Sequence, residues 1–316
     1  MRKLVRLILR LAIFAFVIIA GVATVKTVGF TSKQIPVEPV EPIAISESAI
    51  KHLAKAVQLP TVSEENKVDT TALLNLDTLI QQAFPNVDSL LEKTYVNRFS
   101  LVYKWAGRNP KLPPVLLMGH MDVVPVESEA AWSVPPFSGE VRDGYIWGRG
   151  TMDDKLNVFG ILEATEMLLK EDYQPERTVY FAFGHDEEIS GEHGAKAIAA
   201  KFEQQGIQFE YVLDEGQLIV ENALPGLDAP LGMIGVAEKG YVTLNLTAKL
   251  EEGGHSSMPP KETAIGVLSK AIVKLQENPF PGKIDGATKG LLHHAGPEMN
   301  FPYNVLFANL WLTEGL

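Results

Sequence analysis

Cysteine is absent from the 316 residues of the chain. This absence excludes disulfide bonds, zinc sites built on thiolates and cysteine nucleophiles. Basic residues are also in short supply, because 28 Lys and Arg stand against 39 Asp and Glu, which gives a net charge of −11. A nucleic-acid-binding surface needs clustered positive charge, so the composition argues against that class of partner. Any metal site must therefore use His, Asp and Glu side chains.

Charged residues are missing from Leu11 to Val25, behind an N-terminus that carries four cations (Arg2, Lys3, Arg6 and Arg10). This run is shorter than the roughly 20 residues that cross a bilayer. Long flanking cations can reach the membrane surface and extend the usable length. We interpret residues 1–30 as a retained membrane anchor or a cleaved signal segment. In both cases the basic end stays in the cytoplasm and the body is exported to a periplasmic, lumenal or extracellular space, as a secreted protein if the segment is cleaved.

Residues 31–45 contain three prolines separated by acidic residues, which is typical of an extended, semi-rigid linker. Beyond this linker the sequence divides into a longer part, residues 46–235, and a shorter part, residues 236–316. We predict a separate domain for each part.

The longer part alternates helical and apolar strand patterns. Helices are predicted over residues 46–59, 71–83, 157–170 and 194–205. The apolar runs between them, such as "PPVLLMGH" and "RTVYFAFG", predict buried strands. This alternation predicts an α/β fold with a mainly parallel sheet and helices on both faces.

The shorter part has a different pattern of apolar and polar residues. Apolar and polar residues alternate over residues 240–251, which predicts a half-exposed antiparallel strand. Apolar residues have helical spacing over residues 263–277, and residues 304–316 are interpreted as the start of another strand. We therefore predict an incomplete α+β domain over residues 236–316.

Acidic and imidazole side chains occur in four segments that follow strand patterns or open helices. These side chains are His120 with Asp122, Asp153, Glu187 with Glu188, and Asp214. Because parallel strands end at one edge of a sheet, we expect these groups to converge, and a cation relieves the resulting repulsion. Nitrogen and oxygen ligands of this kind suit zinc, cobalt and manganese. The alternative interpretation is that the acids cap the helices that follow.

Five segments, "GHMDVVP", "WGRGTMDDK", "GHDEEISG", "VLDEG" and "GGHSSMPP", resemble in this order the motifs of the M20 family of metallopeptidases. The branch that contains carboxypeptidase S and the N-fatty-acyl-amino-acid synthase/hydrolases is the most similar. The resemblance covers roughly residues 45–316. It implies a catalytic domain of the zinc-exopeptidase type over residues 46–235 and a lid over residues 236–316 that can form a homodimer.

The same resemblance implies two divalent metal ions, zinc by preference and cobalt or manganese as alternatives. His120 would bind the first ion, Asp153 would bridge both, Glu188 would bind the second, and Asp214 would join His120 on the first. Asp154 and Glu215 lie beside these ligands and are interpreted as helix caps or as supporting groups.

Three further roles follow from the resemblance. Asp122 would orient the ring of His120, and Glu187 would act as general base toward a water molecule activated by the metal ions. His255 would steady the substrate or the oxyanion. The implied reaction is hydrolysis of amide bonds in small peptides or N-acyl amino acids.

One ligand of the family pattern is not found in this sequence. A final histidine ligand is expected after the lid, whereas this chain ends at Leu316 within the predicted lid. We interpret the chain as a fragment of a longer enzyme, with a truncated, inactive product as the alternative. The competing functional hypothesis is a membrane-tethered module that binds metal or dimerises without catalysis.

Overall fold

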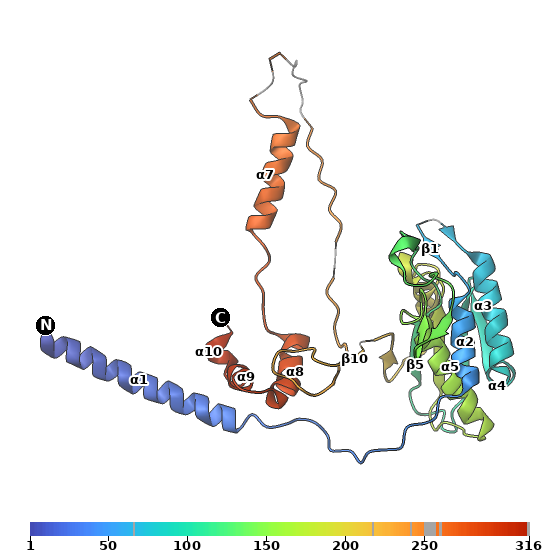
Figure 1. Cartoon of the computed structure of the whole chain (residues 1–316), viewed down its shortest axis with the longest axis horizontal. Coiled ribbons are helices and arrows are strands. Elements are labelled where there is room, and N and C mark those ends of the chain that lie inside the picture. Colours follow the sequence, from blue (N-terminus) through green and yellow to red (C-terminus); the bar gives the residue numbers. More distant parts are fainter. Residues whose placement is uncertain (66, 217, 241, 250–256, 259–260, 315–316) are drawn as a thin grey trace. The chain divides into compact units, whose positions relative to one another are not determined.

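The computed structural model describes the chain except for residues 66, 217, 241, 250–256, 259–260 and 315–316 (Figure 1). It forms two compact units, which are described separately. One consists of Val40–Glu215, and the other combines Met1–Pro39 with Gly216–Leu316.

The unit Val40–Glu215 is built around a five-stranded sheet. Its strands lie in the order β3 (Glu92–Val96), β4 (Ser100–Trp105), β8 (Val179–Gly184), β5 (Val115–His120) and β9 (Val212–Leu213). Strands β8, β5 and β9 are parallel, whereas β3 and β4 form an antiparallel hairpin whose second strand pairs with β8. The predicted α/β fold is therefore confirmed, but the sheet is mixed rather than mainly parallel.

The hairpin explains the departure from a parallel sheet. Three residues connect β3 and β4, and Asn97 and Arg98 both adopt positive φ, at 48° and 71°. Such a short connection joins only antiparallel neighbours, because a parallel pair needs a crossover of a dozen residues or more.

Helices cover both faces of the sheet. On one face, α2 (Glu47–Val57), α3 (Thr70–Ala83), α4 (Pro85–Leu90) and α5 (Lys155–Lys170) share a buried core with alternate residues of β4 and β8. On the other, α6 (Ala195–Gln204) packs on the remaining residues of the same strands. All four helices predicted for this part of the chain are present, with ends that differ by at most a few residues.

Shorter elements lie where strands of the sheet end. They are the hairpin β1 (Ser63–Glu64) and β2 (Lys67–Val68), the 3₁₀ turn η1 (Glu129–Ala131), the hairpin β6 (Glu140–Arg142) and β7 (Tyr145–Trp147), and the 3₁₀ turn η2 (Glu187–Ile189).

The other unit contains α1 (Arg2–Val28), an exposed helix of 27 residues that is long and apolar enough to be a candidate membrane span. Its remaining described elements are β10 (Ile219–Val220), β11 (Leu231–Gly232), α7 (Ala264–Glu277), α8 (Gly286–Ala295), η3 (Gly296–Glu298), α9 (Tyr303–Ala308) and α10 (Leu310–Thr313). The predicted helix over residues 263–277 is thus confirmed. Anchor and cleaved signal remain alternative interpretations of α1.

Two predicted strands in this unit are wrong. Residues 242–249, the described core of the predicted strand 240–251, pair with no other strand in the part of the chain that the structure describes, where β10 and β11 pair with each other. The run from residue 304 is helical instead, as α9 and α10. Short apolar runs do not distinguish strand from helix by periodicity, and leucine and alanine favour the helix.

Candidate metal centre

His120 is the last residue of β5, and its imidazole is almost fully buried. Its Nδ1 lies 3.1 Å from the backbone carbonyl oxygen of Asp122 and 3.4 Å from the Oδ1 of that residue. Both atoms are hydrogen-bond acceptors, so Nδ1 carries the proton of the neutral ring. This tautomer leaves Nε2 with a free lone pair, as a metal ligand requires.

Carboxylates from three other segments surround Nε2 of His120. The nearest oxygens are Oδ1 of Asp153 at 2.9 Å, Oε2 of Glu215 at 3.3 Å and Oε2 of Glu187 at 3.8 Å. These residues come from the start of α5, the end of β9 and η2, which are far apart in the sequence but meet at one edge of the sheet. His120, Asp153 and Glu187 therefore converge as predicted, whereas the segment after β9 contributes Glu215 in place of the predicted Asp214.

Asp122 also holds the acidic pair of η2. Its carboxylate is fully buried, with Oδ1 accepting the backbone N–H of Glu187 at 3.1 Å and Oδ2 that of Glu188 at 3.2 Å. Glu188 in turn accepts the backbone N–H of Val124 through Oε1 at 3.2 Å. One buried carboxylate thus fixes the imidazole of His120 and the backbone of both glutamates.

Asp153 and Asp154 are joined by a cis peptide bond and differ in exposure. The Asp153 side chain is 71% exposed, whereas Asp154 is fully buried and accepts the backbone N–H of His120 at 2.9 Å through Oδ2. Gly119 makes this approach possible, because a Cβ at that position would lie 2.7 Å from the same oxygen. Asp154 thus supports the backbone of His120 and also stands at the N-cap position of α5.

Two sets of side chains in this centre could each hold an ion. His120, Asp153 and Glu188 offer ligand atoms that all lie within 4.8 Å of one another, and so do His120, Asp154 and Glu215. One imidazole nitrogen with several carboxylate oxygens is a donor set that suits zinc and its borderline neighbours. The residues present therefore fit a divalent metal ion.

The crowding of negative charge in the centre shifts the pKa values of its side chains. Burial raises the pKa of Glu188 to about 6, and repulsion from Asp153 adds to the rise. Burial also raises the pKa of Glu187, while the charge of His120 opposes the rise. For His120, burial lowers the pKa, but the hydrogen bond and the charge of Asp122 outweigh burial and raise it to about 10. A cation in this centre would relieve the same repulsion.

Glu215, interpreted from the sequence as a helix cap or a supporting group, has its carboxylate beside the imidazole of His120. The predicted ligand Asp214 is exposed, and its Oδ1 accepts the backbone N–H of Glu215 at 2.9 Å. The family resemblance implied Asp214, not Glu215, as the ligand at this place in the sequence. Strand β9 ends at Leu213, however, so alternation no longer determines which of the two acids faces the imidazole.

A further histidine, His185, precedes Glu187 by two residues. His185 is buried, and its Nδ1 lies 2.6 Å from Oγ of Ser100, so it packs beside β4 rather than facing the carboxylates. Between His185 and the acidic pair, Asp186 accepts the backbone N–H groups of His193 and Gly194. His255 lies outside the residues that the structure describes, and its assigned role remains a prediction.

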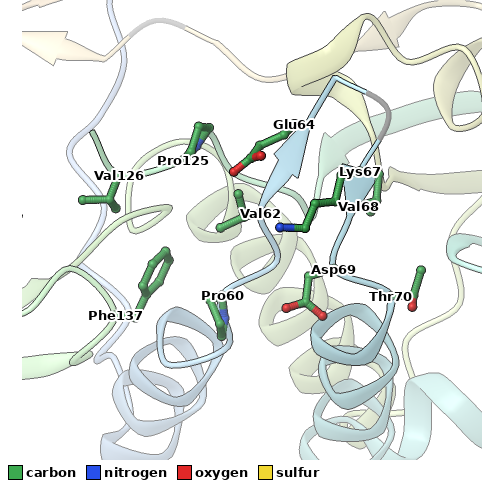
Figure 2. A pocket seen from close by; sticks show the side chains of 10 residues that line it. All are labelled: Pro60, Val62, Glu64, Lys67, Val68, Asp69, Thr70, Pro125, Val126 and Phe137. Carbon is green, nitrogen blue, oxygen red and sulfur yellow. The ribbon is translucent and has the colours of Figure 1, made fainter. Parts of the chain in front are cut away.

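A hollow of about 590 Å³ lies beside the centre, between the β1–β2 hairpin and the loop that follows β5 (Figure 2). Its apolar lining comes from Pro60, Val62, Val68, Pro125, Val126 and Phe137, and its polar lining from Glu64, Lys67, Asp69 and Thr70. Val62 pairs with Val123, and Pro125 follows the Val124 whose N–H binds Glu188. One wall of the hollow therefore begins next to a proposed metal ligand.

Lys67 is the one basic residue of this lining. Figure 2 shows its ammonium reaching into the hollow from the hairpin, between Val62 and Asp69. Within the described residues, no hydrogen bond or ion pair involves this ammonium. The oxygen Oδ1 of Asp69 instead accepts the backbone N–H groups of Thr71 and Ala72 at the start of α3.

Comparison with known proteins relates this centre to a family. An N-fatty-acyl-amino acid synthase/hydrolase, PM20D1 of Xenopus tropicalis, is 44% identical over 83% of this chain and 52% of its own length. A probable carboxypeptidase S-like protein 2 of Dictyostelium discoideum is 40% identical over 99% of this chain and 62% of its own length. The crystal structure of the M20 family metallo-carboxypeptidase Sso-CP2 from Sulfolobus solfataricus aligns with a TM-score of 0.45 at 20% identity, covering 55% of this chain and 38% of that one.

The chain thus spans between half and two thirds of the length of these two curated relatives, at 52% and 62%. The model of peptidase family M20/M25/M40 matches residues 116–292, which include every residue of the centre described above. The chain belongs to peptidase family M20/M25/M40.

Proposed function

We propose that the protein hydrolyses amide bonds of small peptides or N-acyl amino acids with the help of bound divalent metal ions. The observation that carries this proposal is the meeting of Asp153, Glu187 and Glu215 around Nε2 of His120. Membership of the peptidase family and the names of the two relatives support the same reaction class.

The metal ligands we propose are His120, Asp153 and Glu188, with Asp153 in the bridging position between two ions. For the remaining carboxylate beside His120, Glu215 is favoured over Asp214 because its Oε2 lies 3.3 Å from Nε2. A bound divalent ion of this class supplies Lewis acidity, which polarises a carbonyl and acidifies water. Zinc is our first choice, with cobalt and manganese as alternatives.

Asp122 has a positioning role in this scheme. By accepting a hydrogen bond from Nδ1–H it keeps Nε2 of His120 free to bind, and it raises the basicity of the ring. By accepting the N–H groups of Glu187 and Glu188 it holds their backbone at a fixed distance from the same ring.

Glu187 is the proposed general base. Its side chain is half exposed, at 50%, so substrate and water can reach it, while burial of the remainder raises its pKa. A carboxylate with a raised pKa accepts a proton from water and returns it to the leaving amine more readily than one with an ordinary pKa. The amide bond breaks, and the products are a carboxylic acid and an amine.

The hollow beside the centre is the proposed binding place of the substrate end that carries a free carboxylate. Its apolar lining suits a side chain or acyl group, and the ammonium of Lys67, which has no partner among the described residues, suits a carboxylate. The carboxypeptidase S-like and N-acyl-amino-acid names of the relatives describe substrates that have such an end. Dimerisation through the lid and membrane anchoring by α1 remain parts of the proposal.

The decisive experiment replaces Glu187 by glutamine and measures metal content and hydrolysis together. We expect bound metal to be unchanged and hydrolysis of dipeptides and N-acyl amino acids to fall about 10²- to 10⁴-fold, because the proton acceptor is lost. Glu192→Gln is the matched control, since this exposed carboxylate pairs with Lys196. Undiminished hydrolysis by Glu187→Gln would refute the assigned base. A wild-type chain that binds no metal would refute the proposed function itself.

A further inference from the structure

Lys155 is an unusual residue of the unit Val40–Glu215, because its side chain is fully buried. Lysine rarely occupies such a position unless its ammonium has partners. Nζ donates hydrogen bonds to the backbone carbonyl of Ala56 at 2.9 Å and to that of Leu59 at 2.7 Å. These carbonyls lie at the C-terminal end of α2, where the helix dipole favours a cationic donor. The amine therefore links α5 to the end of α2.

The turn that leads into α5 is folded closely around this side chain. Gly150 has φ of +82°, and its carbonyl accepts the backbone N–H of Lys155 at 3.1 Å. A Cβ on Gly150 would lie 2.6 Å from Val123 and 3.4 Å from Cδ of Lys155. Since Asp153 and Asp154 stand between these two positions, the lysine tail fixes the segment that carries both carboxylates.

We propose that Lys155 is a positioning residue, which holds Asp153 and Asp154 in place through its bonds to the end of α2 and so sets the affinity for metal. This inference rests on the proposed metal-dependent function. Metal ligands must be held to within about 0.5 Å of their productive positions, so a loosened turn lowers affinity even where the ligands themselves are intact.

The proposed role depends on donated hydrogens rather than on charge. Burial lowers the pKa of Lys155 to about 7, although the charge of Asp122 opposes this shift. An amine in either protonation state still has two hydrogens for the carbonyls of Ala56 and Leu59. Removing it leaves the buried carbonyl of Ala56 and the partly buried carbonyl of Leu59 without this donor, and the turn is no longer tied to the end of α2.

The absence of cysteine makes a chemical test possible. In the variant Lys155→Cys the new thiol is unique, so it can be alkylated in denaturant and the chain refolded in detergent. Alkylation with 2-bromoethylamine restores a lysine-like amine, whereas 1-iodopropane gives a side chain of similar length without a donor. Refolded wild-type chain, Lys155→Met and Lys170→Met are measured beside them. Lys170 lies at the opposite end of α5 with a side chain that is 62% exposed.

The readouts are Co²⁺ affinity, the visible absorption spectrum of bound Co²⁺ and thermal unfolding of the metal-free protein. We expect Lys155→Met and the propyl form to lose at least about tenfold in Co²⁺ affinity, with an altered spectrum. The aminoethyl form should recover both, and Lys170→Met should match the wild type.

Three results would overturn the proposal. The first is wild-type Co²⁺ affinity in folded Lys155→Met, and the second is full recovery by the propyl form. The third is failure of both neutral forms to fold even with saturating Co²⁺, which would make Lys155 a general core residue. A wild-type chain without Co²⁺ binding is a different outcome, because it refutes the proposed function.

Discussion

Oδ1 of Asp122 accepts the backbone N–H of Glu187 at 3.1 Å, which joins the buried support of His120 directly to the proposed base. The side-chain amide of Asp122→Asn cannot accept every hydrogen bond that the carboxylate accepts. One of the two carboxylate oxygens is replaced by an NH₂ group, which donates hydrogen bonds. We expect metal affinity to fall about 10- to 100-fold. Competition with a chelating dye measures this loss. Asp143→Asn, in the exposed β6–β7 turn, should leave affinity unchanged, and equal losses in both variants would contradict the assigned role.

Metal removal should destabilise the unit that contains the centre. An ion that binds only the folded chain stabilises it by about 2.7 kcal/mol at a free concentration of about 100 times Kd. We therefore expect chelation to lower the melting temperature of the wild type, and added Zn²⁺ to restore it. Asp153→Asn should abolish the Zn²⁺-dependent increase while the apo protein still folds, because the Asp153 side chain is 71% exposed. An undiminished increase in this variant would exclude Asp153 from the ligands.

The two adjacent acids after β9 give opposite expectations. Glu215 presents its carboxylate to His120, whereas Asp214 bonds to its own following N–H. Glu215→Gln should therefore weaken Zn²⁺ binding strongly, and Asp214→Asn should weaken it little. Calorimetric titration of both variants with Zn²⁺ decides between them. The reverse ranking would reinstate Asp214, the ligand implied by the sequence resemblance.

Most residues that meet in the centre could be found in the sequence because each lies next to a clear strand or helix pattern. The apolar run before His120 specifies where a strand ends, and the helical spacing after Asp154 specifies where a helix begins. The choice between Asp214 and Glu215 could not be predicted, since it depends on backbone geometry beyond the last strand residue. The support from Lys155 was also not predictable, because its partners are backbone carbonyls about 100 positions away, with separations of 99 and 96.

The fold shows the same division between local and nonlocal information. Helix α5 was predictable from its own periodicity, whereas the antiparallel pairing of β4 depends on which strand it finds beside it. The final run of α9 and α10 has few residues and no alternation strong enough to overcome helix propensity. The pairing of β4 therefore depends on contacts with residues distant in the sequence and not on its own composition.

Gly119 should tolerate no side chain. An added Cβ would lie 2.7 Å from Oδ2 of Asp154, the atom that accepts the N–H of His120. Gly119→Ala should lower the free energy of unfolding by about 1–3 kcal/mol through overpacking, and should reduce metal affinity as well. Gly160→Ala is the control, because nothing lies within 4 Å of its Cβ and alanine favours a helix. Chemical denaturation of both variants compares the two effects, and equal stability would contradict the close packing at Gly119.

Lys67 should distinguish substrates by their free carboxylate. Lys67→Met removes the ammonium but keeps much of the length of the side chain, so the attraction for a carboxylate in the hollow disappears. We expect KM for an N-acyl amino acid to rise several-fold with little change in kcat, because the ammonium is assigned to binding of the carboxylate and not to proton transfer. Hydrolysis of the matching amide, which has no carboxylate, should be unaffected, and Lys67→Arg should retain most of the preference. If the acid and the amide respond equally to Lys67→Met, the carboxylate end of the substrate does not bind beside this residue.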